Sequence, residues 1–251
     1  MAIVRPLARA PIVEALIDLR VQVLDGISVD TLEKALENHV FGYQKKGPII
    51  RSNFGITINV QDTPVVPQVL GDSKIVGVRL HSADEKYVAQ FTIDSFTLSR
   101  LDPYESWEAL VRETKRVWAI YRQCVQPVRI TRTATRFINN LRLPLRAGER
   151  FEKYLKGLPS MPPDYPQATS SFLQRFVLSE DKIGATAIVT QALEQFTEDK
   201  PQPVILDIDT FRETKFAPDS PDVWAYLDDL RELKNRLFFG AIEEAAVELY
   251  A

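Results

Sequence analysis

The sequence has few of the residues on which most catalytic and metal sites depend. It contains one cysteine and two histidines in 251 residues. A single cysteine excludes an intramolecular disulfide and a cysteine-rich zinc site. His39 and His81 lie about forty residues apart and outside any His-x-x-x-His or His-x-x-Glu-His context. We therefore expect both histidines to be structural, and we expect neither a metal nor a cofactor.

Glycine-rich loops and long apolar runs are also missing. The ten glycines are scattered, and no Walker A, Gly-x-Gly-x-x-Gly or Gly-x-Ser-x-Gly pattern occurs, which argues against P-loop, Rossmann and hydrolase functions. No apolar run approaches the ~20 residues needed to cross a bilayer. Residues 1–10 contain Arg5 and Arg9 but no hydrophobic signal segment, so we expect a soluble, cytoplasmic protein without a membrane partner.

What the sequence does contain is an ordinary globular composition and two sets of similar motifs. Hydrophobic residues make up 45% and charged residues 26% of the chain, enough to bury a core. Phe91-Thr-Ile-Asp-Ser-Phe96 and Leu206-Asp-Ile-Asp-Thr-Phe211 are each followed by a proline and then by Trp-x-x-Leu. We predict an internal duplication, with copies at 1–126 and 127–251 packed as one unit; chance similarity of amphipathic elements is the alternative.

The hydrophobic periodicity predicts a β-α-β-β-β-α order in each copy. The first copy is expected to have a strand at 13–23, a helix with Asp30 as N-cap, strands at 56–60, 75–81 and 87–98, and a helix with Asp102 as N-cap. The second is expected to have strands at 128–143, 171–178, 185–193 and 204–211, with helices at 149–155, from Ser220 and after Gly240, and an exposed proline-rich loop at 158–167. This pattern predicts an α+β fold with mostly antiparallel, curved sheet backed by helices.

Charge is distributed unevenly along the chain. Residues 112–150 contain ten basic and two acidic residues, a net charge of +8, whereas residues 178–251 contain 7 basic and 16 acidic residues, a net charge of −9. Arg132, Arg136 and Arg142 share the parity of the apolar Ile130 and Ile138, so an unbroken strand would place them on the apolar face and they would need anionic partners.

Three arrangements would satisfy these arginines. A bulge could rotate them outward, they could line an anion-accepting cavity, or they could pair with the acidic residues of the second copy, which is the arrangement we favour. Internal pairing needs no ligand; the alternatives are a phosphate or nucleic-acid surface and an acidic protein partner. An arginine-rich, lysine-poor segment favours bidentate pairing over a diffuse nucleic-acid patch.

Three carboxylates offer a different hypothesis. Asp94 and Asp209 occupy matching places in the repeated motif, and Asp207 lies beside the second of them. Paired acids could bind a divalent cation, as metal-dependent nucleases require. The structural interpretation, which we favour, is that these acids accept hydrogen bonds or pair with arginines such as Arg20 and Arg142.

Several short segments resemble a known family. Residues 11–20 (Pro-Ile-Val-Glu-Ala-Leu-Ile-Asp-Leu-Arg), Arg136-Phe-Ile-Asn139 with Pro144, and Asp207-Ile-Asp209 together resemble a sporadically distributed family of uncharacterised prokaryotic proteins of about 250 residues. The resemblance spans nearly the whole chain and implies no established activity or catalytic residue. A sporadic distribution is typical of accessory systems such as antiviral defence.

We expect a non-enzymatic binding or assembly protein, an accessory subunit of a multi-protein system with a protein partner. The proposed surface is the basic strand with Arg132, Arg136 and Arg142, and a homo-oligomer is possible. An anion-sensing or nucleotide-sensing domain is the first alternative, and a metal-dependent nuclease using Asp94, Asp207 and Asp209 is the second.

Overall fold

A computed structural model describes most of the chain. The described residues are 5–24, 26–37, 39, 42–56, 69–146, 149–158, 162, 164–166, 169–193 and 200–251, with the side chains of 52–56 and 69–72 excepted.

The described strands form one open antiparallel sheet. Nine strands lie in the order β2-β3-β4-β5-β1-β6-β9-β8-β7. They are β1 (Ile12–Gln22), β2 (Tyr43–Ile56), β3 (Val69–Ser82), β4 (Tyr87–Thr92), β5 (Ser95–Leu101), β6 (Arg129–Leu143), β7 (Phe172–Glu180), β8 (Ala185–Leu193) and β9 (Gln202–Phe216). Together with the helices, this sheet confirms the predicted α+β class.

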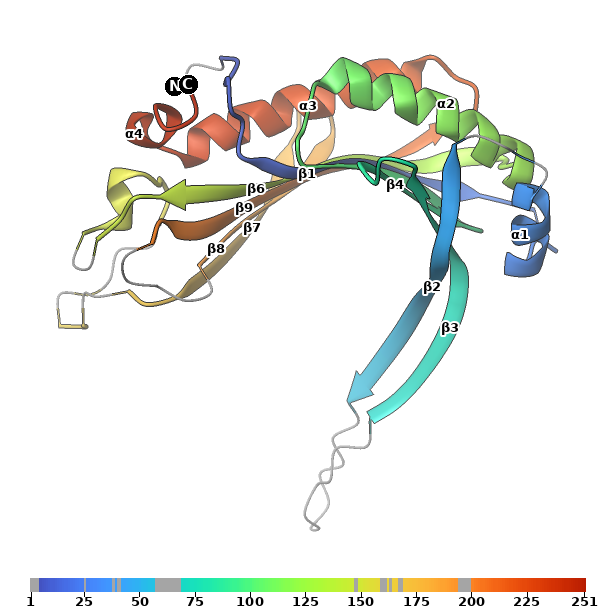
Figure 1. Ribbon diagram of the computed structural model, residues 1–251, viewed down its shortest axis with the longest axis horizontal. Coiled ribbons are helices and arrows are strands. Elements are labelled where there is room, and N and C mark those ends of the chain that lie inside the picture. The colour runs from blue at the N-terminus through green and yellow to red at the C-terminus, as the bar shows by residue number, and fades with distance from the viewer. Residues whose placement is uncertain are drawn as a thin grey trace, which may run out of the picture.

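The helices lie on one face of the sheet. They are α1 (Val29–Glu37), α2 (Trp107–Val125), α3 (Asp222–Ala241) and α4 (Glu244–Val247), with a short 3₁₀ helix, η1, at Phe151–Lys153. The sheet is curved, and its concave face has no helix among the described residues (Figure 1). Below, this concave surface is called the open face. None of the described helices is both long enough and apolar enough to cross a lipid bilayer.

The centre of the sheet joins residues 1–126 to residues 127–251. β1 pairs with β6 in antiparallel register, Ile17 opposite Thr135. β2, β3, β4, β5 and β1 lie on one side of this junction, and β6, β9, β8 and β7 lie on the other. The predicted β-α-β-β-β-α order is therefore wrong in detail for both halves, because the first has an additional strand and the helix expected at 149–155 is only the 3₁₀ turn η1.

The strand expected at 87–98 is interrupted by a tight turn. The Thr92 hydroxyl accepts hydrogen bonds from the backbone N–H groups of Asp94 at 3.3 Å and Ser95 at 2.8 Å, and the chain reverses between β4 and β5. In the second half the similar motif lies within the uninterrupted strand β9. Asp94 and Asp209 therefore do not occupy equivalent local structures, contrary to the prediction.

Strand β2 was not predicted, because Gly47 and Pro48 interrupt the alternation of apolar and polar residues that identifies a strand. Pairing with β3 shifts register between Lys45 and Gly47, which indicates a bulge at this point. The strand expected at 56–60 falls mainly on residues outside those described. The described residues 162 and 164–166 of the proline-rich loop are exposed, as expected.

Two helices begin at residues other than those predicted. Ser28 and Thr31 cap α1 reciprocally: the Ser28 N–H donates to Thr31 Oγ1 at 2.7 Å, and the Thr31 N–H donates to Ser28 Oγ at 3.2 Å. α2 has Ser106 as its N-cap, and Ser106 Oγ accepts from the Ala109 N–H at 3.1 Å. Asp30 and Asp102 are therefore not the N-caps, and Asp102 lies in a turn after β5.

The core lies between the helices and the sheet. Under α2, the Phe91, Phe96, Trp118 and Tyr121 rings pack at centroid distances of 5.2–5.6 Å, and the Tyr121 hydroxyl donates to the Thr92 carbonyl at 3.0 Å. A second cluster under α3 and α4 includes Leu141, Val204 and Phe238. Trp107 and Trp118 are buried in this core, whereas Trp224 is only partly buried.

The cap of α2 can be tested directly. Ser106→Ala removes the side-chain acceptor for an N-terminal N–H group, so we expect a loss of about 1 kcal/mol in the free energy of unfolding, measured by urea denaturation. Asp102→Ala is the matched control and should change this free energy by less than about 0.5 kcal/mol. Equal losses in both variants would contradict the cap assignment.

Candidate functional site

The open face is the first candidate site, because Arg132, Arg136 and Arg142 all lie on it. On β6 the buried residues that face the helices include Thr133, Thr135 and Phe137, and the alternate residues face the other way. An unbroken strand would place the arginines on the core face, but they lie on the opposite face, as expected from the first of the three arrangements, a bulge that rotates them outward. Threonines occupy core positions because their hydroxyl groups find backbone acceptors, as Thr135 Oγ1 does at Leu16 O (3.1 Å).

A bulge explains why the parity of Ile130 was misleading. In the pairing of β6 with β1, Arg132 lies opposite Arg20 and Ile130 lies opposite Val21, so β6 contains one extra residue between Ile130 and Arg132. Ile130 is fully buried in the core, while Arg132 is on the open face. A single register irregularity moves the residues beyond it to the other face relative to an unbroken strand.

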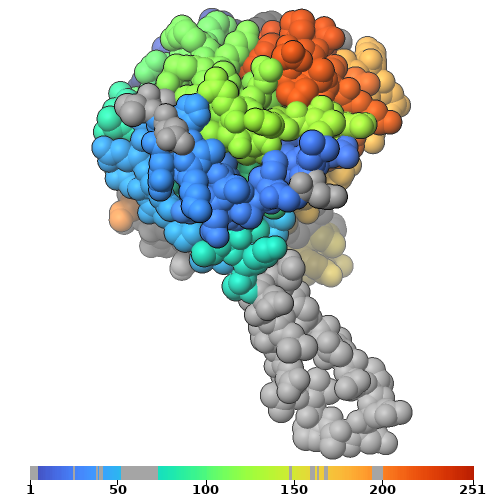
Figure 2. All heavy atoms as spheres, turned by 90° about the vertical axis from the view of Figure 1, so that its right-hand side faces the viewer, coloured from blue at the N-terminus to red at the C-terminus, as the bar shows by residue number. Residues whose placement is uncertain are grey.

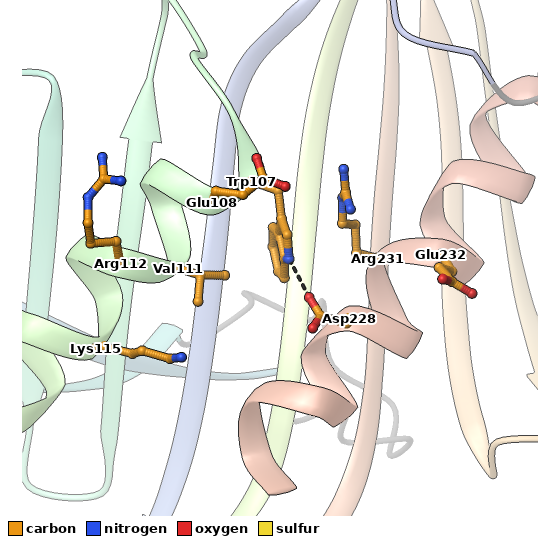
Figure 3. Close-up of a pocket in the computed structure, with 8 residues that line it drawn as sticks. All are labelled: Trp107, Glu108, Val111, Arg112, Lys115, Asp228, Arg231 and Glu232. Atoms are coloured by element: carbon orange, nitrogen blue, oxygen red, sulfur yellow. Dashed lines mark hydrogen bonds between the residues drawn. The ribbon is translucent and has the colours of Figure 1, made fainter. Parts of the chain in front are cut away.

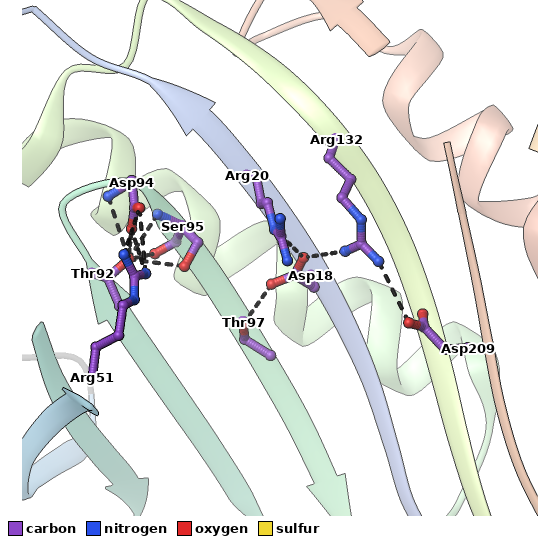
Figure 4. Close-up of polar contacts among 9 residues, drawn as sticks. All are labelled: Asp18, Arg20, Arg51, Thr92, Asp94, Ser95, Thr97, Arg132 and Asp209. Atoms are coloured by element: carbon purple, nitrogen blue, oxygen red, sulfur yellow. Dashed lines mark hydrogen bonds and ion pairs between the residues drawn. The ribbon is translucent and has the colours of Figure 1, made fainter. Parts of the chain in front are cut away.

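Arg132 is at the centre of an ion-pair network that crosses three strands (Figure 4). Its guanidinium donates to Asp18 Oδ1 on β1 at 2.8 Å and to Asp209 Oδ2 on β9 at 3.5 Å. The Thr97 hydroxyl on β5 donates to the other Asp18 oxygen at 2.9 Å. We call Asp18, Thr97, Arg132 and Asp209 the central network.

The central network is substantially buried although no described helix covers it. The Arg132 side chain is 10% exposed and that of Asp18 is 18% exposed. The Arg132 guanidinium carbon lies 4.2 Å from the centroid of the Phe211 ring, which shields it. Burial raises the pKa of Asp209, and the nearby Arg132 and Arg136 partly offset this effect.

Arg136 forms a separate bidentate pair with Asp207. Its Nε and Nη2 atoms donate to the two Asp207 oxygens at 2.8 and 2.5 Å, which raises the pKa of the Arg136 guanidinium. Arg132 and Arg136 thus pair with acidic residues of the second half, as favoured from the sequence, although Arg132 also bridges to Asp18 in the first half.

Arg142 does not join its two predicted companions. Its side chain is exposed, and its guanidinium forms no ion pair with the described residues; its backbone N–H donates to the Tyr250 hydroxyl at 2.7 Å. Six residues of extended strand separate it from Arg136, a distance of about 20 Å. The three arginines therefore do not converge on one small anion.

The three carboxylates of the nuclease hypothesis are not brought together. Asp94 lies in the β4–β5 turn, where it pairs with Arg51 at 3.4 Å. β1 and β6 separate β5 from β9, so Asp94 is about three strand spacings, or ~14 Å, from β9. In the part of the chain that the structure describes, no group of three or more His, Cys, Asp or Glu side chains is placed to hold a metal ion.

A groove between α2 and α3 is the second candidate site (Figure 3). It has a volume of about 720 Å³. The Trp107 indole N–H donates to Asp228 across it at 2.5 Å, and the Arg231 guanidinium lies 5.8 Å from the Trp107 ring. The lining residues are Trp107, Glu108, Val111, Arg112, Lys115, Asp228, Arg231 and Glu232. The groove was not predicted, because its two walls come from distant segments of the sequence.

The two helices that form this groove lie side by side at the surface. Seen from the end of the molecule that carries α1, α2 in green and α3 in orange are neighbours across the top (Figure 2). The lining contains three basic and three acidic side chains. Their formal charges balance, so the lining of the groove has no net charge.

Lys234 is a residue of α3 whose charged side chain is buried. It is 7% exposed, and its Nζ lies 3.9 Å from the centroid of the Phe137 ring. Burial, with a smaller contribution from Arg231, lowers the pKa of its ammonium group to about 7. No local pattern indicates that this residue is buried, since one lysine on a helix rich in charge is normally exposed.

The chain was compared with known proteins. No protein-family model matches it, and no curated protein is similar enough to count as a relative. The function must therefore be argued from the two candidate sites.

Breaking the central network should destabilise the protein. Arg132→Met leaves Asp18 and Asp209 partly buried without their cation, so we expect the free energy of unfolding at pH 7 to fall by about 3 kcal/mol. The loss should be smaller at pH 4, because the pKa of Asp209 rises further in the variant and the protonated acid needs no partner. Arg142→Met, on the same strand but exposed, should change stability by less than about 0.5 kcal/mol. Similar effects of both variants in urea denaturation would contradict this account.

Lys234 should make stability depend on pH. Because the folded pKa is about 7 and the ordinary value is 10.5, the unfolded chain binds the proton more tightly between these pH values. The contribution of Lys234 to stability therefore decreases as pH falls through this window, by at most about 1.4 kcal/mol per pH unit, and is constant below pH 7.

The difference between Lys234→Met and the unmodified protein isolates this contribution. The free energy of unfolding of the variant, relative to the unmodified protein, should increase as pH falls from 10 to 7. Lys115→Met replaces an exposed lysine and should show no such trend. Parallel pH profiles for all three proteins would rule out a depressed Lys234 pKa.

Proposed function

We propose that this protein is a non-enzymatic binding or assembly subunit that receives a protein partner on the open face of its sheet. The proposal includes an internal duplication, in which the two halves meet at the β1–β6 junction. The resemblance to a sporadically distributed prokaryotic family favours an accessory multi-protein system, with antiviral defence as the proposed context.

The observation that supports this function most strongly is the construction of the open face. A curved sheet face without a covering helix normally exposes mobile side chains, but here the central charges are held by one another and by Phe211. Partly exposed apolar residues, such as Leu16 and Ile138, lie between them. A fixed pattern of charged and apolar groups is typical of protein-binding surfaces.

The charge balance of this face favours a protein over a nucleic acid. Arg132 and Arg136 are already paired with three aspartates. Nucleic-acid binding depends on cations that are free to replace the counterions of phosphate groups. A phosphate would have to displace these carboxylates, which lie within hydrogen-bonding distance of the guanidinium groups.

The chemistry of the described side chains supports a non-enzymatic role. Burial raises the pKa of the Cys124 thiol to about 11, so little of it is the nucleophilic thiolate at neutral pH. Asp207 and Asp209 are paired with guanidinium groups rather than free to act as bases.

Site-specific photo-crosslinking tests the proposal. A photoreactive amino acid at Thr190, which lies on the open face of β8 opposite Asp207, should crosslink one defined protein in the organism that carries the gene. The same amino acid at Lys115, on the helix side, should not. The adduct should survive nuclease treatment. In a separate pull-down without the photoreactive residue, Thr190→Arg should reduce copurification of the same protein at least tenfold by blocking the surface.

Two results would contradict the proposed function. One is identical adducts from Thr190 and Lys115, which would show that the open face is not selective. The other is an adduct at Thr190 that disappears after nuclease treatment, which would indicate a nucleic acid.

A further inference from the structure

The outer strand β7 has an unusual apolar edge. It forms one end of the sheet and pairs only with β8 among the described strands. Four of its nine residues are large, exposed hydrophobic residues: Leu173 is 75%, Val177 65%, Phe176 45% and Leu178 42% exposed. Leu173 and Val177 lie on the open face, and Phe176 and Leu178 lie on the helix side. Both faces of the strand are therefore apolar at the edge.

Apart from the charged residues Arg175 and Glu180, this edge lacks the features that normally prevent strand association. Protective edge strands are short, or contain lysine, proline or a bulge. β7 is nine residues long and contains neither lysine nor proline, and it pairs with β8 in unbroken register from Phe172 to Glu180. Among the described residues, none pairs with the outer backbone N–H and C=O groups of β7, and a long, regular edge of this kind can accept another strand.

We propose that β7 pairs in antiparallel orientation with β7 of a second copy of this chain, about a two-fold axis at Val177. The two sheets would become one continuous sheet across the dimer. A two-fold interface requires that each residue meets its partner reciprocally, and antiparallel pairing of one strand with itself satisfies this condition.

The central part of β7, from Arg175 to Ser179, is self-complementary in this register, whereas Leu173 lies opposite the partner's Asp181. Val177 lies opposite Val177 of the partner copy on the open face. On the helix side Phe176 lies opposite the partner's Leu178, and this contact occurs twice. Arg175 lies opposite the partner's Ser179 and diagonal to the partner's Asp181, within reach of its long side chain. In a parallel arrangement with equivalent residues aligned, the two Arg175 side chains would lie together and repel one another.

Self-complementarity favours a second copy over an unrelated strand. A foreign peptide would need its own matching pattern, whereas the second copy supplies the two apolar clusters and the Arg175–Asp181 attraction at once. An edge contact is smaller than the roughly 1,600 Å² of a standard interface. We therefore expect a dissociation constant on the order of 1 to 10 µM.

Sedimentation equilibrium between 1 and 100 µM protein tests the dimer. The unmodified protein should pass from monomer to dimer in this range. Val177→Lys places two cations in contact at the two-fold axis and should weaken association at least tenfold. Val128→Lys makes the same change at a residue that is 42% exposed away from β7, and it should leave association unchanged. Thermal unfolding of each variant verifies that the monomer still folds.

Charge exchange and crosslinking test the register. Arg175→Asp and Asp181→Arg should each weaken the dimer, and the double variant should restore it.

In air-oxidised samples, Val177→Cys should form a disulfide-linked dimer, whereas Ser179→Cys should not. Cys124 is half-buried in both variants. A protein that stays monomeric at 100 µM, or a dimer unaffected by Val177→Lys, would overturn the proposal. Failure of the double variant to recover would overturn the register.

The dimer and the proposed partner on the open face are independent. Thr190 lies opposite Arg175, so the sedimentation of Thr190→Arg is measured beside that of the unmodified protein; Val177→Lys leaves the central network intact. The two sets of experiments can therefore fail separately.

Discussion

The antiparallel pairing of β1 with β6 is the interaction on which the architecture depends. It joins residues from the two halves of the chain into one sheet, and the Arg132 guanidinium ties both neighbouring strands to it through Asp18 and Asp209. If this junction opened, the two core clusters under α2 and α3 would lose their common support. A buried cation shared by two carboxylates also penalises other registers, since a shift of one residue would move Arg132 into the apolar layer.

The fold class was predictable because hydrophobic periodicity is strong in most strands. β1, β6, β8 and α3 lie within a few residues of their predicted positions, since alternation or helical spacing of apolar residues is a local property. β2 and the β4–β5 turn were not predicted, because a bulged strand with glycine and proline breaks the alternation, and because Thr92 and Ser95 resemble ordinary strand residues until the turn is seen.

Only part of the candidate site was predictable from the sequence. Pairing of Arg132 and Arg136 with acidic residues of the second half follows from the cost of an unpaired charge. Their face of the sheet could not be predicted from parity alone, because a bulge in β6 between Ile130 and Arg132 reverses the parity and because threonines at core positions look polar in the sequence. The groove and the burial of Lys234 depend on how α3 packs against the sheet. A local sequence pattern does not predict this packing.

The paired charges at the centre of the open face, unlike the exposed Arg142, have a kinetic consequence. Opposite charges only a few ångströms apart produce a field that decays quickly with distance, so this surface should exert little long-range pull on an approaching molecule. Association there should proceed at the rate of unsteered encounter and respond weakly to ionic strength. Selectivity would then arise after contact, through the lifetime of the complex, because a mismatched surface would leave these ordered groups facing unsuitable neighbours.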